Sequence, residues 1–413
     1  MRRIAAATLT LLLVLGAAVP AFAAPRWKRR LGRMAGSHPV SVLVRVGDRK
    51  LFSARATHTR IPASNQKLLM SMAILDRMGA RNRVETRALV RPASVPAANA
   101  GQADVKDGVV TGDLWVVGGG DPTLGTGGGW AKGVRSPVTR IGRLARAIER
   151  SGVRRINGRI RGSRTPFHHD WWADGWKSSF PSEQVALPSA LSLRGNVYKG
   201  HHTSNPERLV ARALKRKLEA RGVKVSGRAG AGRHPDNLAQ LARVRSAPLW
   251  QILKHTNRVS SNFFAEVLGK RLGVAARGRP GTIAKGAGAI CGWIARHGAH
   301  ARCYDSSGLS YKNHVNARSI VRLLGVADRK PWGDELRASL PQAGKGTLED
   351  RLDGVRIRAK TGTLDRVSAL SGWVWLERLD RWARFSILGN GMDYYSAKNL
   401  EDKMVRLIAA KAR

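Results

Sequence analysis

The sequence predicts an α/β (α+β) protein: a helix-on-antiparallel-sheet domain with a β-rich domain inserted into it. Helical patterns of apolar residues occur near both ends of the chain, with strand-like patterns beside them. Between these ends, a long stretch shows short β-like runs separated by glycine-rich turns. Helices at both ends around a sheet favour one domain split by an insertion. The expected boundaries are 24–80 plus 241–413 for the split domain and 81–240 for the insertion.

The first 23 residues have the organisation of a secretory signal peptide. Arg2 and Arg3 precede an apolar run, and Ala21-Phe22-Ala23 supplies the small-x-small pattern of a cleavage site. The run is short for a membrane anchor, and no later stretch approaches the ~20 apolar residues of a transmembrane helix. No cysteine follows the cleavage site, so a lipid anchor is not expected. We expect an exported protein without a transmembrane anchor, in the periplasm or at the exterior of the cell envelope.

The split domain begins with a basic segment and a hairpin. Residues 24–36 are expected to form a tether or a first helix. Alternating apolar residues at 39–52 predict a β-hairpin. Pro62 then opens a helix that ends at Gly79, because apolar side chains recur with helical spacing between them.

Inside the insertion, strands such as 114–117 alternate with glycine-rich turns, and two helices are expected at 139–151 and 206–221. After the insertion the split domain resumes. The expected elements there are helices at 248–272 and 281–297, a strand at 355–361, a hairpin of 371–377 with 382–388, and a last helix at 396–410.

The chain is strongly basic, with 73 Lys and Arg against 28 Asp and Glu and a formal charge of +45. The positive electrostatic field of such a chain attracts polyanions. Nucleic acid is not the expected partner, because the basic residues are spread along the whole chain and the signal peptide directs the protein out of the cytoplasm. Two interpretations remain: loose association with anionic envelope polymers, or an arginine-rich proteome with no selected partner.

The chain has two cysteines, Cys291 and Cys303. In an exported protein they are expected to form one disulfide closing a small loop; the alternative is two unrelated buried thiols. No metal or cofactor is expected. The adjacent histidine pairs at 168–169 and 201–202 do not share a helix face, and no zinc-binding spacing accompanies them. The glycine-rich stretch 118–129 lacks the ending of a phosphate-binding loop.

Ser64 and Lys67 lie one turn apart at the start of the expected helix. Serine there is commonly a helix cap. A lysine is unfavourable beside the positive helix end, by roughly 0.3–1 kcal/mol, and the same placement lowers its pKa. A lysine with a lowered pKa can accept the proton of Ser64 and activate it as a nucleophile. Ser-x-x-Lys alone is a weak signal, since a chain of this length contains about one or two by chance.

Two further motifs follow in order. Ser260-Ser261-Asn262 occurs in a helical context, and Lys360-Thr361-Gly362-Thr363 lies at the end of an expected strand. A lysine beside two hydroxyls can bind a carboxylate, and a glycine, which has no side chain, lets a substrate backbone approach closely. Together with Ser-x-x-Lys, these motifs form the set used by serine acyl-transfer enzymes.

With these motifs the chain resembles the low-molecular-mass penicillin-binding proteins of the D-alanyl-D-alanine carboxypeptidase/endopeptidase family, class C type, which carry an insertion between the first and second motifs. The resemblance covers nearly all of the chain after the signal peptide. It rests on the segments 60–67, 118–124, 187–191, 305–310, 340–344 and 359–364. It implies a β-lactamase/transpeptidase-like catalytic domain. It also implies peptidoglycan stem peptides as substrates and β-lactams as covalent inhibitors.

The resemblance assigns roles to the motif residues. Ser64 would attack the carbonyl of the penultimate D-alanine, with Lys67 as base. Ser260 would relay a proton to the leaving amine, and Asn262 would hold the substrate amide and Lys67. Lys360 would contribute positive potential.

The third motif would also hold the substrate. Thr361 and Thr363 would bind the terminal carboxylate beside Gly362. The backbone N–H groups of Ser64 and Thr363 would form the oxyanion hole. Ser261 stands where the family often has aspartate, with little effect expected. The insertion looks shorter than in the largest members, which puts a third small domain in doubt.

Two rival functions share some of these features. A β-lactamase uses all three motif types but needs a deacylating base, commonly a glutamate between the second and third motifs, and the sequence offers no clear candidate. A non-catalytic envelope-binding protein would fit the charge, but the intact motif residues argue against it. Asp305 either closes the rear of the site or serves only the turn chemistry of Asp-Ser-Ser-Gly.

Overall fold

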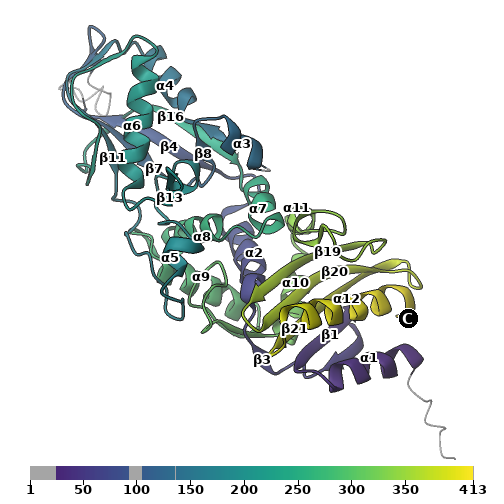
Figure 1. The fold of residues 1–413 in the computed structure, drawn as a ribbon. Coiled ribbons are helices and arrows are strands. Elements are labelled where there is room, and N and C mark those ends of the chain that lie inside the picture. The colour runs from purple at the N-terminus through teal and green to yellow at the C-terminus, as the bar shows by residue number, and fades with distance from the viewer. Residues whose placement is uncertain (1–24, 93–104, 135, 413) are drawn as a thin grey trace, which may run out of the picture.

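The structure, a computed structural model, describes residues 25–92, 105–134 and 136–412. It shows a larger body that holds both ends of the described chain and a smaller body formed by its middle (Figure 1). The predicted signal peptide at 1–23 lies outside the described residues. Within those residues, none of the helices is both long and apolar enough to cross a bilayer.

A five-stranded antiparallel sheet organises the larger body. Its order is β19-β20-β21-β1-β2, so the first two strands of the chain pair with the last three through β1 and β21. The predicted hairpins at 39–52 and 371–388 are present. The strands are β1 (Val40–Val46), β2 (Arg49–Ala54), β19 (Ile357–Leu364), β20 (Val367–Leu376) and β21 (Arg381–Asn390).

Helices cover both faces of this sheet. Alternation along β20 sends Leu370 and Val374 toward one face and Ala369 and Trp373 toward the other, as the period-two geometry of a strand requires. Two helices cover the first face: α1 (Arg26–Gly36) and α12 (Tyr394–Lys411). The helices associated with the second face are α2 (Gln66–Met78), α7 (Leu249–Arg258), α8 (Asn262–Arg277), α9 (Ile283–Arg296), α10 (Ala317–Ala327) and α11 (Gly333–Ser339).

The smaller body begins with β4 (Arg83–Val90) and ends with β16 (Ala239–Pro248), which pair antiparallel where the chain leaves and re-enters the larger body. It contains one sheet of order β15-β11-β7-β4-β16 and another of order β14-β10-β6-β5, each with parallel as well as antiparallel pairs. Its own apolar core is closed by α4 (Ile141–Arg150) and α6 (Pro206–Glu219), near the helices expected at 139–151 and 206–221.

The remaining elements are short. The strands of the two smaller-body sheets are β5 (Val105–Lys106), β6 (Val109–Val110), β7 (Leu114–Gly118), β10 (Arg155–Ile156), β11 (Ile160–Ser163), β14 (Lys224–Val225) and β15 (Gly230–Gly232). Minor pairings join β8 (Leu124–Gly125) with β9 (Thr139–Arg140), β12 (Val197–Tyr198) with β13 (His201–His202), and β17 (Ala301–Arg302) with β18 (His314–Asn316) and β3 (Thr59–Arg60). The short helices α3 (Gly129–Gly133) and α5 (Phe180–Glu183) complete the set.

The helical run expected at 248–272 is two helices, which corrects the sequence-based expectation. Ser260 has a φ of 54°, in the left-handed region, so the helix cannot continue through it. The Ser261 side chain then caps α8 by accepting a hydrogen bond from the Phe264 N–H at 3.3 Å. Apolar periodicity continues on both sides of the break, which is why the sequence pattern does not reveal it.

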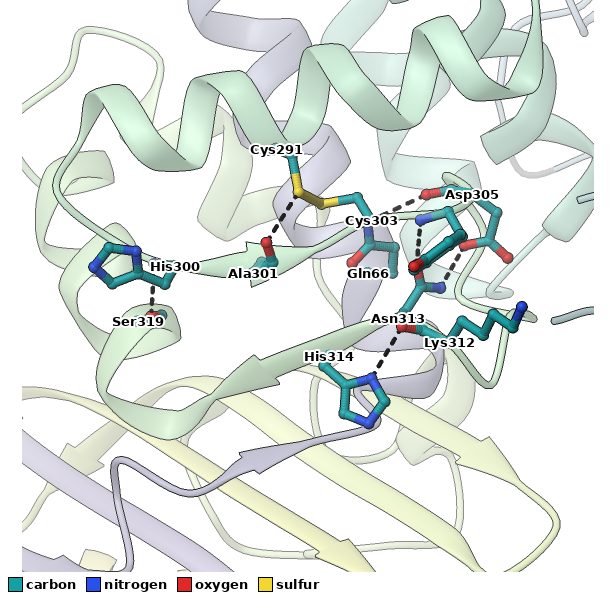
Figure 2. Close-up of a disulfide and its surroundings, with 11 residues drawn as sticks. Gln66, Cys291, His300, Ala301, Cys303, Asp305, Lys312, Asn313, His314 and Ser319 are labelled. Atoms are coloured by element: carbon teal, nitrogen blue, oxygen red, sulfur yellow. Dashed lines mark hydrogen bonds between the residues drawn. A yellow bond between two sulfur atoms is a disulfide. The ribbon is translucent and has the colours of Figure 1, made fainter. Parts of the chain in front are cut away.

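The predicted disulfide is confirmed: Cys291 and Cys303 are bonded, with their Cα atoms 5.8 Å apart. The bond ties α9 to the segment that follows β17 (Figure 2). Asp305 lies two residues after Cys303, so the disulfide anchors the start of a turn that reaches the catalytic motifs.

Candidate active site

Ser64 lies in a single 3₁₀ turn, Ala63–Asn65, that leads directly into α2. Backbone segments from other parts of the chain pack closely against this turn. Ala63 has a φ of 45°, uncommon for a residue with a side chain. A Cβ on Gly308 would come within 1.9 Å of the Ala63 carbonyl oxygen, and one on Gly362 within 3.1 Å of the Ser64 nitrogen. Glycine at both positions lets two distant backbone segments approach the serine.

The Lys67 amine connects the first two motifs. Its Nζ lies 2.9 Å from Ser64 Oγ and 2.8 Å from Asn262 Oδ1. It also donates to the carbonyl oxygen of Ser307 at 2.6 Å. The side chain is fully buried, so these three acceptors meet the donor capacity of an ammonium group and hold the amine against the serine hydroxyl.

Burial lowers the pKa of Lys67 from its ordinary value to about 7, although Asp305 and Glu266 act in the opposite direction. A substantial fraction of the amine is therefore unprotonated at neutral pH and can accept a proton from Ser64. The helix position suggested this property in the sequence; in the structure, burial is the main cause.

Lys360 brings the third motif to the second. Its Nζ donates to Ser260 Oγ at 3.0 Å and to the Thr361 carbonyl oxygen at 2.9 Å. Burial lowers the pKa of Lys360 well below its ordinary value, and the positive charges of Lys67 and Lys398 lower it further. A bound carboxylate would act in the opposite direction and favour the charged amine.

Asn262 is the first residue of α8, directly after the Ser261 cap. Its Oδ1 accepts from Lys67, and its Nδ2 donates to the Gln184 carbonyl oxygen at 3.3 Å. Gln184 belongs to the inserted part of the chain, so Asn262 joins that part to the nucleophile region.

Strand β19 presents the third motif along one side of the site. Asn65 Nδ2 donates to the Lys360 carbonyl oxygen at 3.0 Å, which holds the strand beside the nucleophile turn. Thr361 Oγ1 lies 2.6 Å from Thr347 Oγ1, and Lys398 Nζ donates to the Gly362 carbonyl oxygen at 3.0 Å. Thr363 is exposed further along the same strand.

The structure thus brings the five predicted catalytic residues together as two hydrogen-bonded groups, Ser64–Lys67–Asn262 and Ser260–Lys360. Asn65, the neighbour of Ser64, links the two groups through its hydrogen bond to the Lys360 carbonyl oxygen, and together they form the catalytic network. Thr361 and Gly362 border it, and Thr363 lies at its exposed end.

Asp305 serves the turn beside this network. Its carboxylate accepts from the backbone N–H of Gly308 at 2.9 Å and of Ser310 at 2.7 Å. Trp176 Nε1 and Asn313 Nδ2 also donate to it, at 2.8 and 2.7 Å. Figure 2 shows Asn313 and Gln66 beside Asp305, where Gln66 Nε2 donates to the Asp305 carbonyl oxygen at 3.2 Å. Asp305 therefore provides turn chemistry and links the turn to the inserted part through Trp176.

Sequence reasoning missed several functional contacts. The Ser307 carbonyl, the Gln184 carbonyl and the Thr347 hydroxyl carry no sequence signature. Glu266 is also missed: it lies fully buried on α8, and its carboxylate accepts from the Ser306 and Ser307 N–H groups. Its spacing of four from Asn262, which puts both on one helix face, is a signal that was available.

The histidine pairs have local partners. His169 Nε2 lies 2.9 Å from Glu207 Oε1, and His202 Nδ1 lies 2.7 Å from the Pro181 carbonyl oxygen. Among the described residues, no group of three or more His, Cys, Asp or Glu side chains is arranged to hold a metal ion.

Known proteins match this chain over most of its length. The family model described as the D-Ala-D-Ala carboxypeptidase 3 (S13) family matches residues 40–205 and 190–411. A D-alanyl-D-alanine carboxypeptidase of an Actinomadura species is 27% identical over 431 aligned positions, covering 83% of this chain and 75% of that protein. A carboxypeptidase of Mycobacterium tuberculosis is 29% identical over 352 positions, covering 80% of this chain and 71% of that protein.

Solved structures share the fold. Penicillin-binding protein 4 of Haemophilus influenzae superposes with a TM-score of 0.74 at 18% identity, covering 91% of this chain and 99% of that one. A predatory endopeptidase of Bdellovibrio bacteriovorus gives a TM-score of 0.53 at 17% identity, covering 91% and 95%. The expected fold class, with its extra domain, is confirmed by the first of these.

Proposed function

This chain belongs to the D-Ala-D-Ala carboxypeptidase 3 (S13) family, and from that premise we propose that it trims peptidoglycan stem peptides through an acyl-enzyme on Ser64. It is a serine peptidase of the D-alanyl-D-alanine carboxypeptidase type, related to penicillin-binding proteins. The observation that carries the assignment of Ser64 is the 2.9 Å contact between its Oγ and a buried Lys67 amine with a pKa of about 7.

In the acylation step, Lys67 Nζ takes the proton from Ser64 Oγ as the oxygen attacks the carbonyl carbon of the penultimate D-alanine. The backbone N–H groups of Ser64 and Thr363 stabilise the oxyanion, typically worth about 3–4 kcal/mol per donor. The Ser260 hydroxyl donates a proton to the leaving amine of the terminal D-alanine. The proton on Lys67 passes to Ser260 and restores its hydroxyl, so the net transfer is from Ser64 to the leaving amine, and the Lys67 amine is unprotonated again when the acyl-enzyme has formed.

In the deacylation step, a water molecule attacks the ester and restores the Ser64 hydroxyl. Thr361 and Thr363 bind the terminal carboxylate before the first bond breaks. Lys360, which is buried on the same strand, contributes positive potential. The same serine would be acylated by β-lactams, in line with the β-lactam complex of the Haemophilus influenzae protein.

Glu266 bears on the β-lactamase alternative, because it is an acid between the second and third motifs that lies close enough to influence Lys67. It is a poor candidate for a deacylating base. Its Oε1 is occupied by two backbone N–H groups, and burial together with Asp305 raises its pKa to about 8, so it holds a proton at neutral pH. This arrangement favours the peptidase over the β-lactamase.

The activity is tested by the products formed from defined muropeptides. We expect the purified mature protein to release D-alanine from a pentapeptide monomer, and also to split a cross-linked dimer, as an endopeptidase does. Mass spectrometry distinguishes the two products. Prior treatment with unlabelled penicillin should suppress both reactions. Intact substrates after incubation with protein that a fluorescent penicillin labels would contradict the proposed substrate class.

We also propose that the protein is exported to the periplasm or the cell-envelope exterior and associates loosely with anionic polymers there. A basic cleft of about 1230 Å³ lies between α9, α10 and the β1–β2 hairpin. Asp48 is the one acid among the described residues that line it. The basic residues that line it include Lys50, Arg296, Arg318, Arg322, Arg329 and Arg384. Within the described part of the chain, Lys50, Arg296 and Arg318 form no ion pair or side-chain hydrogen bond.

Neutralising this cleft should weaken binding of a polyanion. We expect the Lys50→Ser, Arg296→Ser, Arg318→Ser triple variant to bind long-chain polyphosphate at least about 10-fold less tightly than the parent at low salt. A matched triple variant on the exposed faces of α4 and α6, Arg143→Ser, Arg216→Ser, Lys217→Ser, removes the same charge elsewhere. Equal losses in the two variants would show that the overall field, and not the cleft, binds the polymer.

A further inference from the structure

Glu266 is a buried acid next to the catalytic network that the proposed reaction does not use. It lies on α8 four residues after Asn262, so the two side chains share a helix face. Its side chain is fully buried, and an ionisable group is rarely placed there without a partner. Its position therefore requires an explanation beyond packing.

The contacts of Glu266 lead to the catalytic lysine through the backbone. Glu266 Oε1 accepts from the Ser306 N–H at 3.0 Å and from the Ser307 N–H at 2.7 Å. The carbonyl oxygen of Ser307 in turn accepts from Lys67 Nζ at 2.6 Å. Glu266 Oε1 thus holds the N–H group of Ser307, and the carbonyl group of the same residue orients Lys67.

Asp305 and Glu266 hold different parts of the turn around Ser307. Asp305 binds the N–H groups of Gly308 and Ser310, which lie after the Ser307 carbonyl, and Glu266 binds the two N–H groups before it. The peptide that carries the carbonyl is therefore restrained on both sides. The turn also lies against the nucleophile, because Gly308 is in contact distance of Ala63.

We propose that Glu266 is a positioning residue for the catalytic base: by holding the backbone at Ser306 and Ser307, it aims the Ser307 carbonyl at Lys67 and keeps the amine against Ser64. The inference deepens the proposed function and rests on it, because it assumes that Lys67 activates Ser64.

The charge state of Glu266 is the second part of the inference. Burial, and then the charge of Asp305, raise its pKa to about 8. The other charged groups facing it are Lys67 on α2 and Lys270, one turn further along α8. A neutral Glu266 leaves Lys67 free to act as an unprotonated base, whereas an ionised Glu266 favours the ammonium form. The other oxygen, Oε2, has no hydrogen-bond partner among the described residues, so replacing it with an amide nitrogen breaks no existing hydrogen bond.

Two substitutions of Glu266 distinguish the effect of its hydrogen bonds on acylation from the effect of its charge. Glu266→Gln keeps an oxygen that can accept from both N–H groups, and we expect it to react with a fluorescent penicillin within about 3-fold of the parent rate at pH 7. Glu266→Ala removes the acceptor, and we expect acylation to slow by about 10- to 100-fold, since misplacing a catalytic group by 1 Å costs about that much. Above pH 8 the ratio of the Gln variant's rate to the parent's should rise, because only the parent acquires the negative charge that favours protonated Lys67.

A matched control comes from the insertion. Glu207 is a buried glutamate with its own polar partner, His169, and lies outside the catalytic network. Glu207→Ala should lower the melting temperature but leave the acylation rate of the folded protein unchanged. Folded Glu266→Ala that acylates at the parent rate, or Glu266→Gln as slow as Glu266→Ala, would overturn the inference. If the parent itself is not labelled, the proposed acyl-enzyme function fails instead.

Discussion

Replacing Ser64 with alanine is expected to abolish covalent labelling by penicillin and to lower D-alanine release by a factor of about 10⁴ or more, as loss of a nucleophile does in other serine peptidases. The substitution removes one oxygen and little else. Lys67 keeps its other two acceptors, Asn262 Oδ1 and the Ser307 carbonyl, so the base stays in place without anything to activate. Labelling is measured by gel fluorescence and intact mass, and release of D-alanine by a coupled assay.

Ser71 provides the matched control for this substitution. It is a fully buried serine on α2, the helix that carries Lys67, and its Oγ donates to the Lys67 carbonyl oxygen at 2.7 Å and not to the amine. Ser71→Ala should cost about 1 kcal/mol of stability and still be labelled like the parent. A Ser64→Ala protein that carries the same covalent label as the parent would show that another residue is the nucleophile.

Replacing Lys67 with methionine should have the second largest effect, a loss of about 10³- to 10⁴-fold in the acylation rate constant. Methionine has a similar length but no proton acceptor that could take the Ser64 proton. The buried amine also predicts the pH dependence of the parent. Because its pKa is about 7, the reactive unprotonated form increases as the pH rises through 7, and acylation should follow with a midpoint near that value.

A second buried lysine tests whether the loss of any buried lysine would slow acylation as the loss of Lys67 does. Lys270 on α8 is also fully buried, but its amine pairs with Asp170 at 2.7 Å, away from Ser64. Lys270→Met should destabilise the protein, because it leaves the Asp170 carboxylate without its lysine partner, but the variant should still be acylated because Lys67 remains beside Ser64. A parent profile that rises only near the ordinary lysine value, or Lys67→Met that acylates normally, would contradict the role of Lys67 as base.

The site concentrates amines around one strand. Lys67, Lys360 and Lys398 are all buried near β19, and Glu401 is the acid paired with Lys398 at 3.6 Å. Burial lowers the pKa of all three, and for Lys360 the two neighbouring lysines lower it further. A substrate that ends in a carboxylate would reduce this repulsion, which agrees with a peptidase that recognises a free C-terminus.

The local parts of the site follow directly from the sequence. Ser64 and Lys67 share a helix face because three residues make nearly one turn. The alternation in 371–388 predicted a hairpin, and the described strands β20 and β21 pair as expected. The order of the three motifs, together with the longer segments around them, indicated the family.

The break between α7 and α8 shows where local pattern fails. Apolar spacing continues across 258–262, but Ser260 adopts a left-handed conformation that the pattern cannot express. That conformation places the Ser260 hydroxyl 3.0 Å from Lys360 Nζ. Tertiary contacts such as this one hold Ser260 in a backbone conformation that would be unfavourable on its own.

By itself, the sequence determined the chemistry of the site: a serine with a lysine one turn away, an amide after a helix cap, and a lysine beside two hydroxyls on a strand. Only the tertiary structure decided how the lysine is aimed. The Ser307 carbonyl lies 240 residues along the chain from Lys67, and Glu266 holds it through backbone N–H groups. Every residue type has the same backbone carbonyl and nearly all have the same N–H, so no pattern of side chains can reveal these contacts before the chain is folded.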